Sequence, residues 1–444
     1  MRRMEMVGSV RVQLMRVLLR RLLLFVVCAC CLAWPVHSTW AQQKGEPTYR
    51  DKDAAFKSIT QSELSQIIKY LASPKLEGRG CWEKGGIAAA DLFCEQFEKS
   101  NLKPIGDEGT FKQAFSYTYS GKSDWKSSNV VGMAEGSDEE FKGEYIVFGA
   151  HYDHLGLKRK GQFWPGADDN ASGTAAVMEL AEAFGRCELR PKRSMIFALF
   201  GAEERGLYGS QHFAEHSPVP VEKIVAMINL DMIGRNKANE VWLIGAATSP
   251  DLDAQINEAN KTLKLKLLYD PATDIADSDH YNFYLKNIPV VFLHGGLHND
   301  YHKPADTAEK IVYPKVLATT QLAFLTGWSV AETPERPKFQ KLPEGAAGGR
   351  LGIIAAEIDE AMETELGLKG FTAIRVADVI KGSPADKIAL KKDDIIIEFD
   401  GKRFPEDEGI VKFKEYVKTA KKDKPTKMVV VRDKKRGNVT VVLK

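Results

Sequence analysis

Two imidazoles and a carboxylate follow directly after a short apolar run, in the sequence VFGAHYDH at positions 147–154. A buried strand that ends in such residues carries metal-binding side chains to its own carboxyl end. A single histidine beside a strand end is more often a core or surface residue than a ligand. His151 therefore needs partners elsewhere in the chain before it predicts a metal site.

Further acidic and imidazole side chains follow other predicted strands or precede a predicted helix. They are Asp168, Asp169, Glu203, Glu204, Asp231, His298, Asp300 and His302. Taken singly, each has an ordinary explanation, such as a helix cap or a solvated surface. So many carboxylates converging on one rim would repel one another unless cations lay between them. The mixture of imidazole and carboxylate without thiolate predicts two divalent metal ions, zinc first, with Mn²⁺ or Co²⁺ as substitutes.

The adjacent carboxylates Glu203 and Glu204 indicate what the metals would do. Neighbouring side chains of an extended chain point in opposite directions, so we expect one to bind metal and the other to stay free. A free carboxylate beside a metal-activated water can take the proton of that water and later deliver it. The pair therefore predicts metal-assisted hydrolysis.

The elements that would position these residues alternate between strand and helix. Predicted strands cover 129–134, 144–149, 194–200, 221–230, 240–244 and 289–293, and predicted helices cover 61–71, 84–99, 172–184, 207–216, 251–262 and 315–330. This alternation predicts an α/β fold with a mostly parallel mixed sheet flanked by helices. In such a sheet the site lies outside the carboxyl ends of the strands.

A second, smaller domain is predicted at 349–444, after a linker at 333–348 that is rich in Pro, Gly and Ala. It is long enough to fold, and it has its own strands around one helix. The strands are at 371–379, 394–399, 428–431 and 439–443, and the helix is at 406–418. The catalytic part then covers 45–332, so the chain has an α/β domain and a small β-rich domain.

The first residues of the chain differ in kind from the rest. Several arginines precede an apolar run at 22–34, which is too short to span a bilayer comfortably, and small residues follow up to Ala41. We interpret 1–41 as an export signal, which places the protein in the periplasm or outside the cell. The sequence VCAC at 27–30 also resembles a lipobox, so membrane contact is expected only if the chain is lipid-anchored; an uncleaved anchor is a third reading.

Charge and cysteine content exclude some classes of partner and leave others open. The 444 residues carry a formal charge of only +2, which does not favour a nucleic-acid binder. Three of the six cysteines lie in the predicted signal, which leaves Cys81, Cys94 and Cys187. This odd trio is no disulfide framework, and both a Cys81–Cys94 bond and three separate thiols stay open.

Five motifs in order carry a resemblance to a known family. They are GAHYDH (149–154), GADDNASG (166–173), GAEE (201–204), NLDM (229–232) and YHKPADT (301–307). Together they resemble the motif set of the M28 family of co-catalytic zinc peptidases, typified by secreted bacterial aminopeptidases. The strings LEGRG (76–80) and SDH (278–280) add minor support, and the resemblance covers about 60–330.

This resemblance implies a ligand set for two zinc ions. Asp169 would bridge the two ions, His151 and Asp231 would complete one site, and Glu204 and His302 would complete the other. His302 is preferred to the nearby His298 because only His302 lies in the YHKPADT motif. A cis peptide bond is also implied after Asp169.

The resemblance also implies catalytic roles. Glu203 would be the general base, and Asp153 would orient His151, as metal-bound histidines usually require. A hydroxide that bridges the zinc ions would attack the scissile carbonyl of a peptide or protein substrate. No role is implied for His154, His280 or Asp279, which would line the pocket or be ordinary loop residues.

The small domain resembles a PDZ domain of the bacterial protease type. Its motifs are RLGI (350–353), GSPA (382–385) and LKKDDII (390–396) followed by DG (400–401), with Asp393 where such domains commonly have Gly. The resemblance implies that the amides of 351–353 bind a peptide C-terminus, while the next strand pairs with the peptide and the helix at 406–418 forms the other wall. The alternative is a purely structural appendage.

These observations favour an exported di-zinc metallo-exopeptidase, an aminopeptidase before a carboxypeptidase. Two alternatives remain: a glutaminyl cyclase-like enzyme with one zinc ion, and a non-catalytic peptide-binding or receptor-like protein. The five intact ligand positions argue against both. Substrate preference, the end of the peptide that is trimmed and the oligomeric state are not determined by the sequence.

Overall fold

The computed structural model describes residues 47–119, 122–157, 162–269, 275–342, 350–406 and 408–443. The predicted export signal, residues 343–348 of the predicted linker and residue 349 lie outside these ranges. Within them, no helix combines the length and the apolar character needed to cross a membrane. Contacts join Thr48–Lys444 into one compact unit, in which we distinguish an amino-terminal domain up to 342 and a carboxyl-terminal domain from 350.

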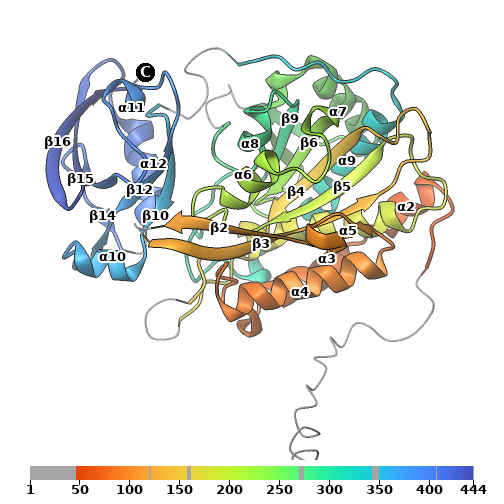
Figure 1. Ribbon diagram of the computed structural model, residues 1–444, viewed down its shortest axis with the longest axis horizontal. Helices are drawn as coiled ribbons and strands as arrows, with labels where there is room; N and C mark the ends of the chain where they lie inside the picture. Colours follow the sequence, from red (N-terminus) through yellow and green to blue (C-terminus); the bar gives the residue numbers. More distant parts are fainter. Residues whose placement is uncertain are drawn as a thin grey trace, which may run out of the picture. The chain divides into compact units, whose positions relative to one another are not determined.

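A nine-stranded mixed sheet forms the centre of the amino-terminal domain (Figure 1). Its strand order is β1-β3-β5-β4-β6-β9-β7-β8, and β2 pairs with β3 beside this path. The strands are β1 (Lys103–Pro104), β2 (Lys112–Tyr119), β3 (Lys122–Ala134), β4 (Tyr145–His151), β5 (Ser194–Phe200), β6 (Ile224–Asp231), β7 (Glu240–Ile244), β8 (Lys266–Tyr269) and β9 (Val290–His294). Because β5, β4, β6 and β9 run parallel, their carboxyl ends meet at one edge of the sheet.

The four parallel strands are almost continuously apolar because both faces of the sheet are covered. One face packs against α2 (Lys52–Ser58), α3 (Gln61–Leu71), α4 (Lys84–Lys99), α5 (Gly173–Gly185), α7 (Pro250–Leu263) and α9 (Tyr313–Glu332). The other face packs against α6 (Tyr208–Glu215) and α8 (His280–Tyr284). At the start of α3, Thr60 Oγ1 accepts the Glu63 N–H at 3.2 Å and donates to the Glu63 carboxylate, so Thr60 is the N-cap of this helix.

The predicted α/β class is confirmed, and several elements have the predicted bounds. The helices α3 and α4 and the strands β5 and β7 begin and end where the sequence pattern placed them. The hairpin of β2 and β3 was not predicted: β2 was missed, and β3 begins seven residues before the predicted strand. Cys81, Cys94 and Cys187 are free thiols, so the structure does not contain the Cys81–Cys94 bond that the sequence left open.

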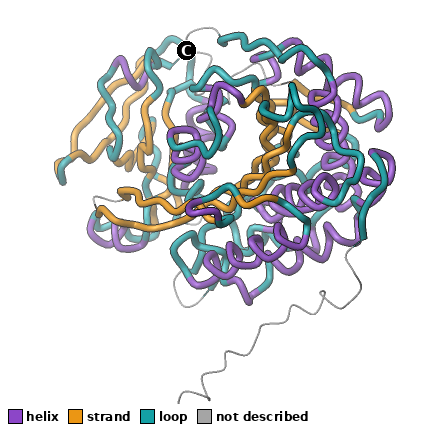
Figure 2. The backbone as a smooth tube through the Cα atoms, turned by 45° about the vertical axis from the view of Figure 1, so that its right-hand side comes forward, coloured by secondary structure: helices purple, strands orange, loops and turns teal. Residues whose placement is uncertain are grey.

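In the carboxyl-terminal domain, strands account for more residues than helices do (Figure 2). Its antiparallel sheet has the order β10-β12-β13-β15-β16. The elements are β10 (Ile353–Glu357), α10 (Glu360–Glu365), β11 (Phe371–Thr372), β12 (Ile374–Val379), α11 (Pro384–Lys387), β13 (Ile395–Phe399), β14 (Phe404–Pro405), α12 (Gly409–Thr419), β15 (Pro425–Arg432) and β16 (Lys435–Val442). β10 is an edge strand of this sheet, and α12 packs beside it.

Candidate metal centre

Two of the predicted ligands are the last residues of neighbouring parallel strands. His151 ends β4 and Asp231 ends β6, and the His151 Nε2 atom lies 3.3 Å from Asp231 Oδ1. The Ser278 hydroxyl donates to Asp231 Oδ2 at 2.8 Å and accepts from the Asn229 side chain, also at 2.8 Å. The minor SDH motif at 278–280 thus has a structural role, because Ser278 orients a predicted ligand.

Asp169 lies in an irregular helical turn, Ala167–Ser172, directly before α5. The peptide bond between Asp169 and Asn170 is cis, as the family resemblance implied. The Asn170 side chain ties this turn to the end of β6 by donating to Leu230 O at 3.0 Å. Asp306 Oδ2 accepts the backbone N–H groups of Asp168 and Asp169 at 2.9 and 3.1 Å. The turn is therefore fixed by Asn170 and by Asp306, and the Asp169 carboxylate points toward His151 and His302.

The two oxygens of Asp169 face two different groups of side chains. Oδ1 lies 3.3 Å from His151 Nε2, and Oδ2 lies 3.0 Å from His302 Nε2. His302 Nε2 also lies 3.2 Å from Glu204 Oε2. The structure thus brings together all five predicted ligands, with Asp169 in the bridging position between a His151–Asp231 half and a His302–Glu204 half.

Glu203 and Glu204 both point into the site. The expectation that they point in opposite directions, which assumed an extended chain, is therefore wrong. Residues after β5 form a turn, in which Glu203 O accepts the N–H groups of Gly206 and Leu207 at 2.8 and 2.9 Å and Ala202 has a φ of 59°. Glu203 Oε2 lies 3.9 Å from His151 Nε2, whereas Glu204 lies with His302. The two carboxylates therefore face the two different halves of the site.

Asp153 is fully buried, but its carboxylate does not make the contact expected of it. The His151 Nδ1 atom lies 3.0 Å from the backbone oxygen of Asp153 and 4.0 Å from its Oδ1. That Oδ1 instead accepts the Glu203 N–H at 3.1 Å. Asp153 thus orients His151 through its carbonyl and the predicted base through its carboxylate.

Arg79 was not predicted as a site residue, although it lies in the minor LEGRG motif. Its side chain is buried and donates to the carbonyls of Leu71, Tyr152, Pro165 and Gly166 at 2.7 to 2.9 Å. Tyr152 directly follows His151, and Pro165 and Gly166 lie shortly before Asp169, so Arg79 joins the segments that carry these two ligands. Burial lowers the pKa of Arg79 to about 10, so it remains charged at neutral pH.

The remaining polar residues of the sequence motifs separate into those in the site and those outside it. His154 Nδ1 lies 2.6 Å from Glu204 Oε1 and 3.7 Å from Asp169 Oδ2, so His154 belongs to the site. His298 Nε2 faces Asp168 Oδ2 at 3.2 Å, which agrees with the preference for His302 as the ligand. His280 packs against Phe292, with 4.9 Å between the ring centroids.

The pKa values of the carboxylates in the site are shifted in different directions by burial and by neighbouring charges. Burial raises the pKa of Glu203 well above its ordinary value, and Glu204, Asp279 and Asp231 raise it further against the opposing charge of His151. The pKa of Glu204 is lowered despite its burial, because His302 and His154 stabilise its anion. The adjacent carboxylates therefore differ in proton affinity, and Glu203 is the better proton acceptor.

The donor atoms fit a pair of divalent cations. Asp169 Oδ2 and His302 Nε2 are buried and lie 3.0 Å apart without hydrogen-bond geometry, and the buried His154 Nε2 also has no hydrogen-bond partner. Buried polar atoms are normally paired, and these atoms are grouped with other carboxylate and imidazole donors. His151, Glu203 and Asp231 each offer an atom within 4.8 Å of the others, and so do His154, Asp169 and Glu204. Imidazole and carboxylate donors without thiolate suit zinc.

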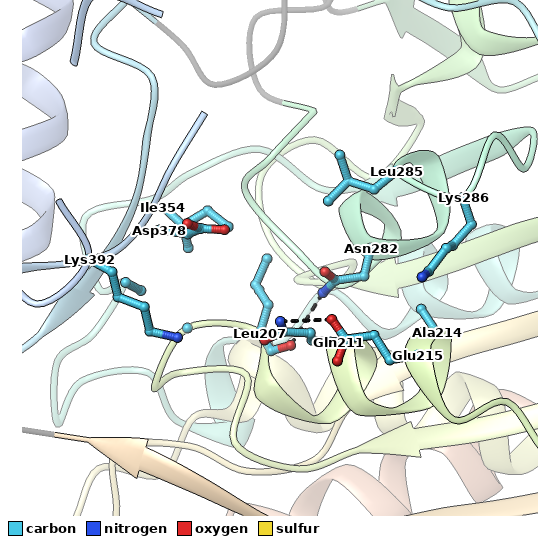
Figure 3. Close-up of a pocket in the computed structure, with 12 residues that line it drawn as sticks. Leu207, Gln211, Ala214, Glu215, Asn282, Leu285, Lys286, Ile354, Asp378 and Lys392 are labelled. Atoms are coloured by element: carbon cyan, nitrogen blue, oxygen red, sulfur yellow. Dashed lines mark hydrogen bonds between the residues drawn. The ribbon is translucent and has the colours of Figure 1, made fainter. Parts of the chain in front are cut away.

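Two hollows lie beside this centre. One is lined by Glu203, Glu204 and His302 together with residues of β10 and α12. The other lies between α6, α8 and the carboxyl-terminal domain, where Leu207 and Asn282 face Ile354 across it (Figure 3). None of the predicted ligands lines the second hollow, so the chemistry belongs to the first.

Comparison with known proteins agrees with this geometry. Residues 129–326 match the model of peptidase family M28, and 349–443 match the PDZ domain, so both predicted resemblances are confirmed. The aminopeptidase YwaD of Bacillus subtilis is 30% identical over 230 residues, which are 48% of this chain and 47% of that protein. The chain thus matches about half the length of this curated relative.

Solved structures share the fold. LapA of Legionella pneumophila is 26% identical, with a TM-score of 0.51 over 64% of this chain and 76% of its own. The glutaminyl cyclase of Porphyromonas gingivalis is 15% identical, with a TM-score of 0.50 over 60% of this chain and 97% of its own. The second likeness shows a common fold and carries no statement about activity.

Proposed function

We propose that the chain, whose residues 129–326 match peptidase family M28 and whose residues 349–443 match the PDZ domain, is an exported di-zinc exopeptidase that acts as an aminopeptidase. Its substrates would be peptides or proteins with a free amino terminus. The observation that carries the proposal is the Asp169 carboxylate, whose two oxygens face the His151 and His302 imidazoles at 3.3 and 3.0 Å. A bridging carboxylate between two sets of donors suits two cations better than one.

Five side chains would hold the two ions. Asp169 would bridge them, His151 and Asp231 would complete one site, and Glu204 and His302 the other. Zinc bound there supplies Lewis acidity, which polarises the scissile carbonyl and lowers the pKa of water. His154 is a further donor on the Glu204 side, 2.6 Å from Glu204 Oε1, and would either join that site or orient Glu204.

Glu203 would move the proton. Its raised pKa suits a group that takes a proton from water and passes it to the departing amine. The backbone N–H of Glu203 is anchored on the buried carboxylate of Asp153 at 3.1 Å, which limits movement of the base during that transfer. Asp153 would thus be a positioning residue for both Glu203 and His151.

A glutaminyl cyclase-like enzyme with one zinc ion, which the sequence left open, is the second candidate. The complete five-residue set favours two ions. A non-catalytic peptide binder would not need the Glu203 carboxylate beside an intact set of ligands. Metal stoichiometry and product analysis separate the three functions.

Export remains part of the proposal and rests on the sequence of 1–41, which the structure does not describe. The signal would take the chain to the periplasm or outside the cell, with lipid anchoring through the VCAC sequence at 27–30 as the alternative. Amino-terminal sequencing of the protein recovered from the expressing cell distinguishes cleavage near Ala41 from lipidation.

One experiment tests the proposed function directly. The protein lacking 1–41 is loaded with zinc and incubated with a mixed peptide library, either free or blocked at each end, and products are read by mass. Loss of single residues from free amino ends, abolished by a chelator and restored by zinc, supports the proposal. Trimming from the carboxyl end, amino-terminal ring closure or no product would contradict it.

A further inference from the structure

The edge strand of the PDZ domain lies beside the predicted catalytic centre. Glu357, the last residue of β10, has its Oε1 atom 3.2 Å from Nδ1 of His302. The hollow next to Glu203, Glu204 and His302 continues along this strand and along α12. The lining residues from these two elements are Ile354, Ala355, Ala356, Glu357, Ile410 and Lys414. One continuous hollow therefore connects the predicted metal ligands with the groove between β10 and α12.

Buried contacts hold the two domains in this arrangement. The Arg375 side chain of β12 is fully buried, donates to the backbone oxygen of Arg205 and lies 4.7 Å from the centroid of the Tyr119 ring. The Tyr119 hydroxyl donates to Glu357 O at 2.9 Å. On β10, Ile354 belongs to the same apolar cluster as Leu207 of the amino-terminal domain. A buried guanidinium with specific acceptors disfavours loose attachment of the PDZ domain.

The backbone of β10 presents unpaired edge groups to this hollow. In an antiparallel ladder, two facing residues either exchange backbone hydrogen bonds or both direct their N–H and C=O groups away from each other. Ala355 faces Val376, whose N–H and C=O bond instead to Asp394 O and Asp393 N, both at 2.8 Å. The N–H and C=O of Ala355 therefore point away from β12, toward the open edge, where an extended peptide can add as a further strand.

The direction of such a peptide follows from the loop before β10. The chain turns at Gly352, which has a φ of 84° and whose added Cβ would lie 2.1 Å from Ser383 Cβ. PDZ domains hold a peptide carboxylate at the amides of this loop. A peptide with its carboxylate at 351–353 that lies along β10 must run antiparallel to it. Its amino end then lies beside Glu357, and so beside His302 and Glu204.

We propose that the PDZ groove and the metal centre are two ends of a single substrate site for short peptides with a free α-carboxylate, trimmed from the amino end. This inference rests on the proposed peptidase function and specifies its substrate class. From Ile353 to Glu357 there are four residue steps of about 3.4 Å, or about 14 Å. About four or five peptide residues pair along this length, and one or two more reach the catalytic carboxylates, so the favoured peptides have about five to seven residues.

The test compares free and amidated peptides of increasing length on the zinc-loaded full mature chain. Each peptide begins with Leu and ends with Val, with two to ten residues in all, and kcat/KM is read from released Leu. We expect kcat/KM of the free acid to exceed that of the amide by about tenfold or more at five to seven residues, because only peptides of these lengths engage both ends of the site. For peptides of two residues, the ratio of the two kcat/KM values should be near one.

A variant tests the role of the strand edge without touching the metal ligands. Proline is tolerated on edge strands where its missing N–H faces outward, so Ala355→Pro should preserve the fold and remove one peptide contact. It should abolish the preference for the free acid at five to seven residues, and the acid-to-amide ratio is taken within each variant so that a general loss of rate cancels. Hydrolysis of a leucyl anilide, measured in parallel on the parent, reports the metal centre alone.

The outcomes separate this inference from the proposed function. An acid-to-amide ratio that does not change with length, or one that Ala355→Pro leaves intact, overturns the shared site while the peptidase function stands. Release of residues from the carboxyl end also overturns it, because the direction would then be wrong. If the parent cleaves neither peptide nor anilide, the proposed function itself fails.

Discussion

Replacing Glu357 by alanine should weaken zinc binding in the half of the site that contains His302. Glu357 Oε1 lies 3.2 Å from His302 Nδ1, while His302 Nε2 faces Asp169 and Glu204. A carboxylate on the second nitrogen of a metal-bound histidine fixes the ring and raises its basicity, and its loss typically costs about 10–100-fold in metal affinity. This corresponds to about 1.4–2.7 kcal/mol.

The neighbouring side chains limit how far the ring can find another partner. The His302 side chain is 5% exposed and that of Glu357 13%, so water replaces the lost acceptor poorly. Glu357→Gln keeps an oxygen acceptor but loses the charge, so its effect should be smaller than that of Glu357→Ala. Glu360→Gln, an exposed change three residues further on, is the matched control.

The assay is a zinc titration against a competing chelator, which resolves a tight and a weaker site. One site should weaken in Glu357→Ala and less in Glu357→Gln, while Glu360→Gln binds both ions as the parent does. Unchanged affinity at both sites in Glu357→Ala would refute the reasoning. Equal weakening at both sites would also refute it, because loss of domain packing would then be the cause.

Three further changes test the packing around the site. Arg79→Met should lower the free energy of unfolding by about 3 kcal/mol or more, because it leaves several buried carbonyls unpaired; denaturant titration against the exposed Lys75→Met checks this. Arg375→Met should increase proteolysis between the two domains relative to Arg403→Met, an exposed position, because the buried guanidinium joins them. Burial raises the pKa of Glu179 well above its ordinary value, so the stability that Glu179 contributes is present at low pH and is lost as pH rises. Glu179→Gln should therefore stabilise the protein more at pH 8 than at pH 5, as measured by thermal unfolding; an equal gain at both values would contradict this.

The parallel core of the fold was predictable because its signal is local. The strands β4, β5 and β6 are nearly continuous apolar runs, and in each case the residues after the run carry the chemistry. Parallel neighbours bring their carboxyl ends together, so His151 and Asp231 could be placed on one rim from sequence alone. Asp169 could be placed because its motif precedes a clear helix.

The β2–β3 hairpin was harder to predict for a physical reason. β2 alternates buried and exposed residues at the side of the sheet, and its exposed positions are the small residues Ala114, Ser116 and Thr118. Such a strand lacks the long apolar run that identified β4 and β5. Its pairing with β3, rather than its own composition, stabilises it.

The supporting contacts of the site could not be read from the sequence. Arg79 is separated from Tyr152 by 73 positions and from Gly166 by 87, and an arginine in a glycine-containing turn normally indicates an exposed residue. The turn that brings Glu203 and Glu204 into the site together depends on a positive φ at Ala202, where the residue type gives no signal. Glu357 lies in another domain, and only the packing of that domain brings it to His302.

The proposed mechanism is tested most directly by the metal content and turnover of Glu203→Gln, measured on the same preparation. In this mechanism Glu203 transfers the proton and five other residues hold the two ions. We therefore expect two zinc ions per chain, as in the parent, with kcat lowered by about 10²–10⁴-fold, the usual contribution of a general base. Normal turnover in this variant would contradict the assigned base, and a parent protein that binds a single zinc ion would contradict the di-zinc site.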